Sequence, residues 1–318
     1  RRAMTLHIFN PEHDMALASG ERNYTPTLIV QRMARELAWL PTLWAANALT
    51  INDNPVWKDI TAVDPWGWDA TLRHRLMMLG VPATSMPTEA YIEGVRRLSS
   101  RRTAVTALEQ FMRSGVDGLC GESHWVSEES DLPQTGARVL KAPWSSSGRG
   151  LLFVDGEMTE AQRRWCHNII VHQGGIAVER LCDKAMDWAM EYETDKEGEV
   201  RFVGLSLFTN NGNGAYAGNV LAPQADKMRA IGIDDSRLQE LIELHMAFLA
   251  KHIAPYYAGP LGIDMLSCAD GRINPCVEIN LRRTMGHVAL AIERRNGYDE
   301  HKKFEVGFDK QSGFYARY

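Results

Sequence analysis

Two neighbouring segments, Gly262-Ile263-Asp264-Met265-Leu266 and Asn274-Pro275-Cys276-Val277-Glu278-Ile279-Asn280, decide how this chain is interpreted. Both show the apolar and polar alternation of β-strands, and Ala269-Asp270-Gly271-Arg272 between them is typical of a hairpin turn. Alternation predicts that Cys276, Glu278 and Asn280 lie on one face of the second strand, with the apolar residues on the other.

The hairpin turn sets which residues face one another. A three-residue turn at 270–272 brings Asp264 directly opposite Glu278. Two facing carboxylates repel unless a metal ion or a proton lies between them. With the amide of Asn280 they offer the oxygen ligands that Mg²⁺ or Mn²⁺ binds. The sequence therefore predicts a metal site at Asp264, Glu278 and Asn280, while an ordinary exposed strand face would give the same pattern.

A second segment has the composition of a phosphate-binding loop. Lys141 ends an apolar strand, and Ser145-Ser146-Ser147-Gly148-Arg149-Gly150 follows it. Such small side chains leave the backbone N–H groups open to close approach. The segment is not a Walker A loop, because its lysine precedes the glycines. A plain hairpin turn rich in serine and glycine explains it equally well.

A third segment, Ile176-Ala177-Val178-Glu179-Arg180-Leu181, is an apolar strand that breaks into a connecting stretch. Its backbone suits the edge of an adenine base, and Asp187 shortly afterwards suits the hydroxyl groups of a ribose. Taken alone, this pattern is common in proteins and carries little weight.

In this order, the three segments resemble the ATP-grasp superfamily, over about residues 101–288. The resemblance implies that ATP and Mg²⁺ or Mn²⁺ are the cofactors, and that Asp264, Glu278 and Asn280 hold the metal. It implies that Arg282 acts in catalysis, with Arg283 beside it. The implied nucleotide-binding residues come from four stretches of the chain: Arg102, Lys141, Ser145–Gly150, Glu179, Arg180, Leu181 and Asp187.

The chain departs from the family pattern at three places. Arg102 stands where the family usually has a lysine. The spacing from Glu179 to Asp187 is one residue longer than usual. Pro260-Leu261-Gly262 stands where many ligases of the family carry an arginine. Stabilisation of an acyl phosphate therefore falls to Arg282 or Arg283.

The expected fold is α/β (α+β), the ATP-grasp fold, with three lobes. Residues 1–100 alternate strands with helices, which predicts a lobe with a parallel sheet. Residues 101–175 form the central lid subdomain, and residues 176–318 the C-terminal subdomain with the metal site. Among the individual elements, we predict short strands at 43–45 and 169–172.

Other polar clusters have more than one interpretation. Asn10-Pro11-Glu12-His13-Asp14 follows the first strand, where it forms a turn or faces a substrate cleft. The segment from Asn210 to Asn219 is a loop that covers an acceptor site or lies in solvent. His287 is a catalytic base or the start of a helix. The cysteines at 120, 166, 182, 268 and 276 have no evident chemistry.

Composition excludes several classes of protein. Hydrophobic residues make up 45% and charged residues 24%, which is typical of a globular fold and not of a disordered chain. A net charge of -5 argues against binding nucleic acid through bulk electrostatics. The five cysteines are not arranged in CxxC pairs. Because there is neither a membrane-spanning apolar run nor a signal-peptide pattern, we expect a cytoplasmic protein that contacts no membrane.

The leading functional hypothesis is an ATP- and Mg²⁺-dependent ligase. It would join a carboxylate to an amine, or a similar nucleophile, through an acyl phosphate. The substrates are small molecules or peptides, and the sequence leaves their identity and the oligomeric state open. Two alternatives remain: an ATP-grasp kinase acting on a small molecule, and a regulatory protein that binds ATP without turnover.

Overall fold

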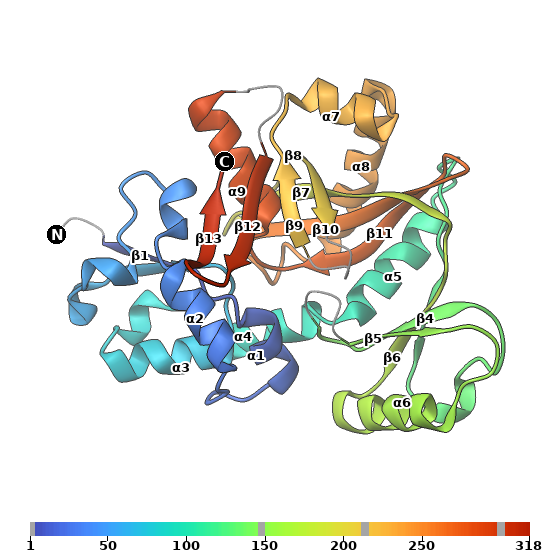
Figure 1. The fold of residues 1–318 in the computed structure, drawn as a ribbon, viewed down its shortest axis with the longest axis horizontal. Coiled ribbons are helices and arrows are strands. Elements are labelled where there is room, and N and C mark those ends of the chain that lie inside the picture. Colours follow the sequence, from blue (N-terminus) through green and yellow to red (C-terminus); the bar gives the residue numbers. More distant parts are fainter. Residues whose placement is uncertain (1–3, 146–149, 211–215, 298–302) are drawn as a thin grey trace.

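The computed structural model describes residues 4–145, 150–210, 216–297 and 303–318. Within them the strands form three sheets, of two, four and seven strands (Figure 1). The strands are β1 (Thr5–Ile8), β2 (Ala62–Pro65), β3 (Ser123–Val126), β4 (Arg138–Lys141), β5 (Leu151–Val154), β6 (Ile176–Arg180), β7 (Lys184–Thr194), β8 (Val200–Asn210), β9 (Tyr216–Val220), β10 (Gly259–Cys268), β11 (Ile273–Asn280), β12 (Lys303–Asp309) and β13 (Gly313–Arg317). The α-helices are α1 (His13–Ser19), α2 (Leu28–Glu36), α3 (Ala70–Leu79), α4 (Glu89–Leu98), α5 (Arg101–Met112), α6 (Glu160–Gln173), α7 (Gln224–Ile231), α8 (Asp235–His252) and α9 (Met285–Asn296).

The first lobe is built on a parallel pair of strands, as the sequence predicts. Leu6 of β1 lies opposite Val63 of β2. Leu6, Leu72 and Leu76 are buried in a small core that joins this pair to α3. The strand predicted at 43–45 is wrong, because the chain there forms a short 3₁₀ helix, Leu40–Leu43, and then a turn.

The four-stranded sheet has the antiparallel order β3-β6-β4-β5 and packs against α6. The strand predicted at 169–172 is wrong, since these residues lie inside α6. A capping box at Thr159 and Gln162 starts this helix. Cys166, Ile169 and Ile170 then contact the sheet at helical spacing, which an apolar run of four residues does not reveal.

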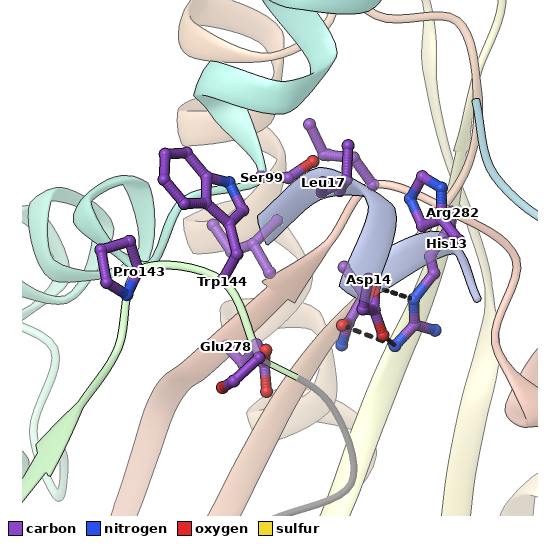
Figure 2. A pocket seen from close by; sticks show the side chains of 12 residues that line it. His13, Asp14, Leu17, Ser99, Pro143, Trp144, Glu278 and Arg282 are labelled. Atoms are coloured by element: carbon purple, nitrogen blue, oxygen red, sulfur yellow. Dashed lines mark hydrogen bonds and ion pairs between the residues drawn. The ribbon is translucent and has the colours of Figure 1, made fainter. Parts of the chain in front are cut away.

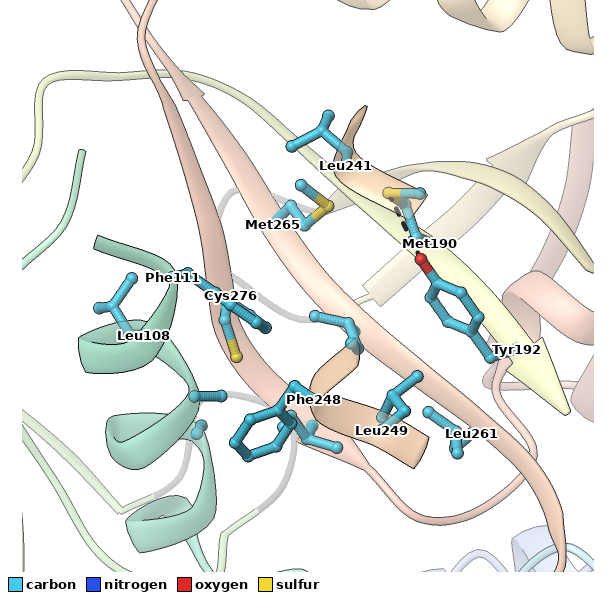
Figure 3. Packing of buried hydrophobic residues seen from close by; sticks show 14 of the residues in the cluster. Leu108, Phe111, Met190, Tyr192, Leu241, Phe248, Leu249, Leu261, Met265 and Cys276 are labelled. Carbon is cyan, nitrogen blue, oxygen red and sulfur yellow. Dashed lines mark hydrogen bonds between the residues drawn. The ribbon is translucent and has the colours of Figure 1, made fainter. Parts of the chain in front are cut away.

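The seven-stranded sheet is the centre of the molecule, with the order β11-β10-β7-β8-β9-β12-β13. Helices α5 and α8 pack on one of its faces, where Phe111, Phe248 and Leu249 contact apolar side chains of the strands (Figure 3). Helix α9 packs along β8 and β9. A separate apolar cluster joins α9 and β12 to the first lobe.

The β10–β11 hairpin has the predicted register, with Asp264 opposite Glu278. Beyond this pair the register shifts, because Leu266 lies opposite Asn274 and β11 carries extra residues around Pro275. Cys276 is buried in the apolar cluster that includes Phe111 (Figure 3), so it belongs to the core. That it shares a face with Glu278 stays a prediction.

The sheets do not follow the predicted lobe boundaries at every point. β6 begins at Ile176, yet it belongs to the four-stranded sheet, and α5 packs on the seven-stranded sheet. The limits at residues 100 and 175 stay a prediction. The segment predicted as a loop from Asn210 to Asn219 ends in a strand, since β9 starts at Tyr216; residues 211–215 lie outside the described part. Among the described residues, no helix combines the length and apolar character needed to cross a lipid bilayer.

Candidate functional site

The three predicted metal ligands lie together at the end of the β10–β11 hairpin. Asp264 faces Glu278 across the strands, and Asn280 Nδ2 donates a hydrogen bond to Asp264 Oδ2 at 3.3 Å. Burial and the neighbouring charge of Glu278 raise the pKa of Asp264 to about 7. The two carboxylates therefore resist being charged together, and a divalent cation between them would remove that conflict.

A third carboxyl group, missed in the sequence, lies beside this pair. Glu191 of β7 is 1% exposed, and burial and the charge of Asp264 raise its pKa to about 8. Two glycines make room for its side chain. A Cβ atom on Gly262 would lie 2.5 Å from Glu191 Oε2, and one on Gly286 would lie 2.1 Å from Oε1. The sequence offered one signal, the position of Glu191 in an alternating strand next to β10.

Helix α5 places Arg101, and not Arg102, in the site. Arg101 Nη2 donates to Ser145 Oγ at 2.9 Å and lies 3.2 Å from Glu278 Oε1. Arg102 is exposed, with its guanidinium 5.7 Å from the centre of the Trp125 ring. Helical spacing signals this choice, because Arg101 precedes Ala104, Val105 and Leu108 on the buried side of α5.

Lys141 and Glu179, both predicted to bind nucleotide, form a close ion pair. Lys141 Nζ lies 2.6 Å from Glu179 Oε2, and both side chains are largely buried. They come from the adjacent strands β4 and β6. The structure thus holds a lysine ammonium group at the end of β4, directly before the serine- and glycine-rich loop.

That loop is described at its two ends. Ser145 accepts from Arg101, and Gly150 returns to the strand by accepting from the Ala142 N–H at 2.8 Å. Gly150 has φ +70°, and a Cβ atom there would lie 2.7 Å from the Cβ of Ser145. A larger residue is therefore excluded by both conformation and space. Ser146, Ser147, Gly148 and Arg149 lie outside the described residues.

The remaining predicted nucleotide ligands lie at the end of β6 and on β7. Arg180 and Leu181 are exposed. Asp187 accepts from Lys184 Nζ at 2.7 Å and from Asn210 Nδ2 at 3.3 Å. Their roles toward a nucleotide stay predictions.

Arg282 lies in a narrow pocket formed by the first lobe and the hairpin (Figure 2). Its Nε and Nη2 donate to the two carboxylate oxygens of Asp14 at 2.9 and 3.0 Å, and Nη2 donates to Asn280 Oδ1 at 3.1 Å. Burial alone would raise the pKa of Asp14, but the Arg282 charge and hydrogen bonds hold it below its usual value. Glu278 lines the same pocket.

Arg283 points to a different place. Its Nη2 lies 3.3 Å from Asp64, and its guanidinium lies 4.6 Å from the centre of the Trp44 ring. It is absent from the described lining of the pocket that contains Arg282. Arg282 thus lines the pocket that contains Glu278 and Arg283 does not, and catalytic roles for both arginines stay predictions.

The cluster from Asn10 to Asp14 serves both a turn and the pocket. Asn10 and His13 are buried and contact Asp69 Oδ2, each at 3.2 Å. These contacts fix the turn that presents Asp14 to Arg282. Substrate contact by the cluster stays a prediction.

His287 lies at the start of α9 and outside the described lining of the Arg282 pocket, and its Nδ1 lies 3.2 Å from Glu191 Oε2. Its Nδ1 accepts from the Thr284 N–H at 3.2 Å, and its Nε2 donates to the Tyr192 carbonyl at 3.0 Å. Burial lowers its pKa to about 3. Both ring nitrogens are occupied, so the helix-start interpretation is supported, although the ring is buried and not solvated.

The donor set of the hairpin suits a hard divalent cation. The carboxylates of Asp264 and Glu278 face each other on neighbouring strands, and carboxylate oxygens are ligands of the kind that Mg²⁺ prefers. The Asn280 amide lies beside them with Nδ2 toward Asp264 and Oδ1 toward Arg282, so the amide would have to turn to offer its oxygen to the ion. The positively charged Arg101 and Arg282 lie at the edge of the group, where phosphate oxygens would meet them.

Comparison with known proteins gives one curated relative. No family model matches the chain. The butirosin acyl-carrier protein L-glutamate ligase of Niallia circulans is 27% identical over 169 residues, which is 51% of this chain and 37% of that protein. The chain thus spans little more than a third of that relative's length.

Three solved structures share the fold. ADP-bound N5-carboxyaminoimidazole synthetase of Staphylococcus aureus has a TM-score of 0.53 at 9% identity, covering 96% of this chain and 82% of that one. An ATP-analogue complex of Campylobacter jejuni biotin carboxylase has a TM-score of 0.51 at 14% identity, covering 93% of this chain and 71% of that one. Rhizobium etli pyruvate carboxylase has a TM-score of 0.55 at 16% identity, covering 93% of this chain and 28% of that one. The chain therefore has the ATP-grasp fold, as the three motifs predicted.

Proposed function

We propose that this protein is an ATP- and Mg²⁺-dependent ligase that joins a carboxylic acid to an amine through an acyl phosphate. One observation carries the proposal: Asp264, Glu278 and Asn280 converge beside Arg101 and Arg282. This arrangement combines oxygen ligands for a cation with two fixed positive charges for phosphoryl oxygens.

The residues of the site divide the work as follows. Lys141, oriented by Glu179, binds nucleotide phosphates through its ammonium group. Arg101 lies between Glu278 and Ser145, where the loop at 145–150 meets the metal ligands. Arg282, held by Asp14, offsets charge on the phosphoryl group as it moves to the substrate carboxylate. Bound at Asp264, Glu278 and Asn280, Mg²⁺ would polarise the phosphoryl oxygens.

The curated relative supports the choice of a ligase and suggests an acid to try first. Its name gives L-glutamate as the group that it ligates. We therefore propose amino acids, L-glutamate among them, as candidate carboxylate substrates. A cytoplasmic location and small-molecule or peptide partners remain part of this proposal.

Trapping with hydroxylamine tests the proposed chemistry. The purified chain is incubated with ATP, Mg²⁺, hydroxylamine and one acid at a time from a panel of amino acids and dipeptides. A ligase transfers the γ-phosphoryl group to the acid and releases ADP. Hydroxylamine then displaces phosphate from the acyl phosphate and gives a hydroxamate, which forms a coloured complex with Fe³⁺. Hydroxamate that depends on both ATP and a particular acid is the expected result.

The alternatives give different products in the same assay. A kinase acting on a hydroxyl group would release ADP and yield a stable phosphate ester, with no hydroxamate. A regulatory protein would bind Mg·ATP in calorimetry and release no ADP with any acid. Either result would reject the ligase.

A further inference from the structure

Three cysteines from distant parts of the chain lie together near the end of β6, the strand predicted to contact the nucleotide. Cys120 precedes β3, Cys182 follows β6, and Cys268 ends β10. Their sulfur atoms all lie within 4.8 Å of one another, and Cys120 Sγ lies 3.3 Å from Cys268 Sγ. No pair among them has a recognisable spacing in the sequence, so only the fold brings them together.

Backbone hydrogen bonds fix the three segments that carry these cysteines. The Cys120 N–H donates to the Ile273 carbonyl at 2.9 Å, and the Cys268 N–H donates to the Arg272 carbonyl at 2.8 Å. The Ala269 N–H donates to the carbonyl of Asp183, next to Cys182, at 2.8 Å. Each cysteine is therefore held at, or next to, a bonded backbone position, and the sulfur cluster is organised in advance.

The three thiols border a pocket of about 380 Å³. Cys120 and Cys268 are 5% and 6% exposed, whereas Cys182 is half-buried. The pocket is also lined by charged and polar groups, among them Glu122, Asp183, Asp270 and Arg272. A ligand bound by the three sulfurs would thus have a water or a carboxylate within reach on its open side.

We propose that Cys120, Cys182 and Cys268 form a binding site for a thiophilic metal ion, with Zn²⁺ as the representative ion. Three sulfur ligands and one further donor complete the four-coordinate geometry that Zn²⁺ adopts. Binding exchanges three thiol protons for one ion: Zn²⁺ replaces three S–H protons, which pass to solvent, and no oxidant is needed. Arg272 also lines this pocket, where it forms an ion pair with Asp270 at 2.8 Å.

The number of sulfur atoms favours a metal over a disulfide. A disulfide between Cys120 and Cys268 would use two thiols and leave Cys182 beside them without a function. Burial raises the pKa of Cys120 to about 12 and also raises the pKa of Cys182. The thiols act as ligands only when a cation displaces their protons, which makes the predicted affinity steeply dependent on pH.

The site is tested with the full chain, reduced and freed of metal by a chelator. Zn²⁺ is titrated against a chromophoric chelator in excess Mg²⁺, which occupies any oxygen site. We expect one ion per chain, an increase in Tm on binding, and weaker binding at lower pH. Co²⁺ in place of Zn²⁺ should give a thiolate-to-cobalt charge-transfer band, which oxygen ligands at Asp264 do not produce.

Serine variants separate a metal site from a chance cluster. Cys182→Ser and Cys268→Ser should each weaken Zn²⁺ binding by more than about 100-fold, the upper range for losing a group that only supports a ligand. Cys166→Ser, in the separate core beneath α6, is the matched control and should leave Zn²⁺ binding unchanged. Far-ultraviolet circular dichroism checks that each variant is folded.

Two results would overturn the proposal. One is Zn²⁺ binding by the wild type no tighter than by the variant in which all three cysteines are serine. The other is a Cys120–Cys268 disulfide in the isolated protein, detected by mass spectrometry, together with no Zn²⁺ binding after reduction. Since the readout is metal binding, failure here leaves the proposed ligase activity unaffected.

Discussion

Arg282 and Asp14, which are 268 positions apart in the sequence, form a two-point ion pair with both carboxylate oxygens engaged. The pair joins the first lobe to the segment directly after β11. Arg282 is therefore not a free cation awaiting an anion. Its guanidinium plane is fixed by Asp14, and it donates further hydrogen bonds to Asn280 Oδ1 and to the Arg283 carbonyl.

Asp14→Asn should lower kcat roughly 10-fold, or about 1.4 kcal/mol in the barrier, with little change in the KM for ATP. The asparagine keeps the shape of the side chain but loses the charge that holds Arg282 in place. Steady-state kinetics of the ligase reaction measure the effect. Asp64→Asn, which breaks the similar pair of Arg283 outside the pocket, should leave kcat within about twofold. An equal loss in both variants would show that Arg283 shares the task.

Asp264→Asn combined with Glu278→Gln should abolish Mg²⁺-dependent turnover while the chain stays folded. The change removes two charged oxygen donors from adjacent strands and also ends their repulsion. ADP release as a function of Mg²⁺ concentration, together with the Tm of the metal-free variant, gives both readouts. Undiminished activity of the double variant would refute the metal assignment.

Arg101→Ala should impair phosphoryl transfer far more than Arg102→Ala. Only Arg101 contacts Ser145 and Glu278, and removing a charge from such a buried hydrogen-bonded position costs roughly 1.5–3 kcal/mol. Arg102 is the matched control, because it is the next residue of the same helix and faces solvent. A larger loss of activity in Arg102→Ala than in Arg101→Ala would indicate that Arg102 contacts the nucleotide.

Lys141→Ala should weaken ATP binding by roughly 10-fold to 100-fold, as expected for the loss of a charged hydrogen-bond donor to phosphate. Titration calorimetry with Mg and a non-hydrolysable ATP analogue measures the affinity directly. Lys251→Ala, at the exposed end of α8, removes the same charge away from the site. If both variants bound ATP as the wild type does, Lys141 would not touch phosphate.

The metal-free protein should lose stability as pH rises from about 6.5 to 8.5. Asp264 and Glu191 have pKa values of about 7 and about 8 in the fold, raised mainly by burial, against ordinary values of 3.8 and 4.5. In this range the folded chain holds protons that the unfolded chain has already released, so each rise in pH lowers the free energy of unfolding until the folded carboxyl groups themselves ionise, near pH 8. His245 and His287, whose pKa values burial lowers to about 4 and about 3, are neutral in the fold; in the unfolded chain they titrate near 6.5, so they add little pH dependence above about pH 7.

Thermal denaturation in EDTA at several pH values tests this expectation. The Tm should fall toward alkaline pH, and Mg²⁺ should raise it more at about pH 8.5 than at about pH 6.5. Asp264→Asn should flatten the pH dependence of the metal-free protein. A Tm that is independent of pH in the wild type would mean that these carboxyl groups are ionised in the fold without a metal.

The fold and the pairing of β10 with β11 were predictable because short segments of sequence determine them. Asp264 and Glu278 are joined by a short turn, so counting turn residues fixes their pairing. The parallel pair β1–β2 and the position of Lys141 also follow from short patterns. The local pattern was wrong at residues 169–172, because a short, mostly apolar run fits a strand and a turn of the helix α6 equally well.

The missed residues are brought together only by contacts between distant parts of the chain, which the sequence pattern does not reveal. Glu191 is one of several polar residues in β7, and its neighbour Asp264 is known only once β7 pairs with β10. The three cysteines near the end of β6 have no sequence spacing that links them. Arg101 is different, because the helical phase of α5 already places it with the buried residues, and a closer count would have preferred it to Arg102.

The apolar cluster between the first lobe and α9 has a consequence for synthesis of the chain. Phe9, Leu37 and Leu40 of the first lobe share this cluster with Val288 and Phe304. During translation, the first three residues are synthesised early and the last two near the end of this sequence. The apolar residues of the first lobe therefore stay exposed until Phe304 has left the ribosome. Exposed apolar surface of this kind binds chaperones during synthesis.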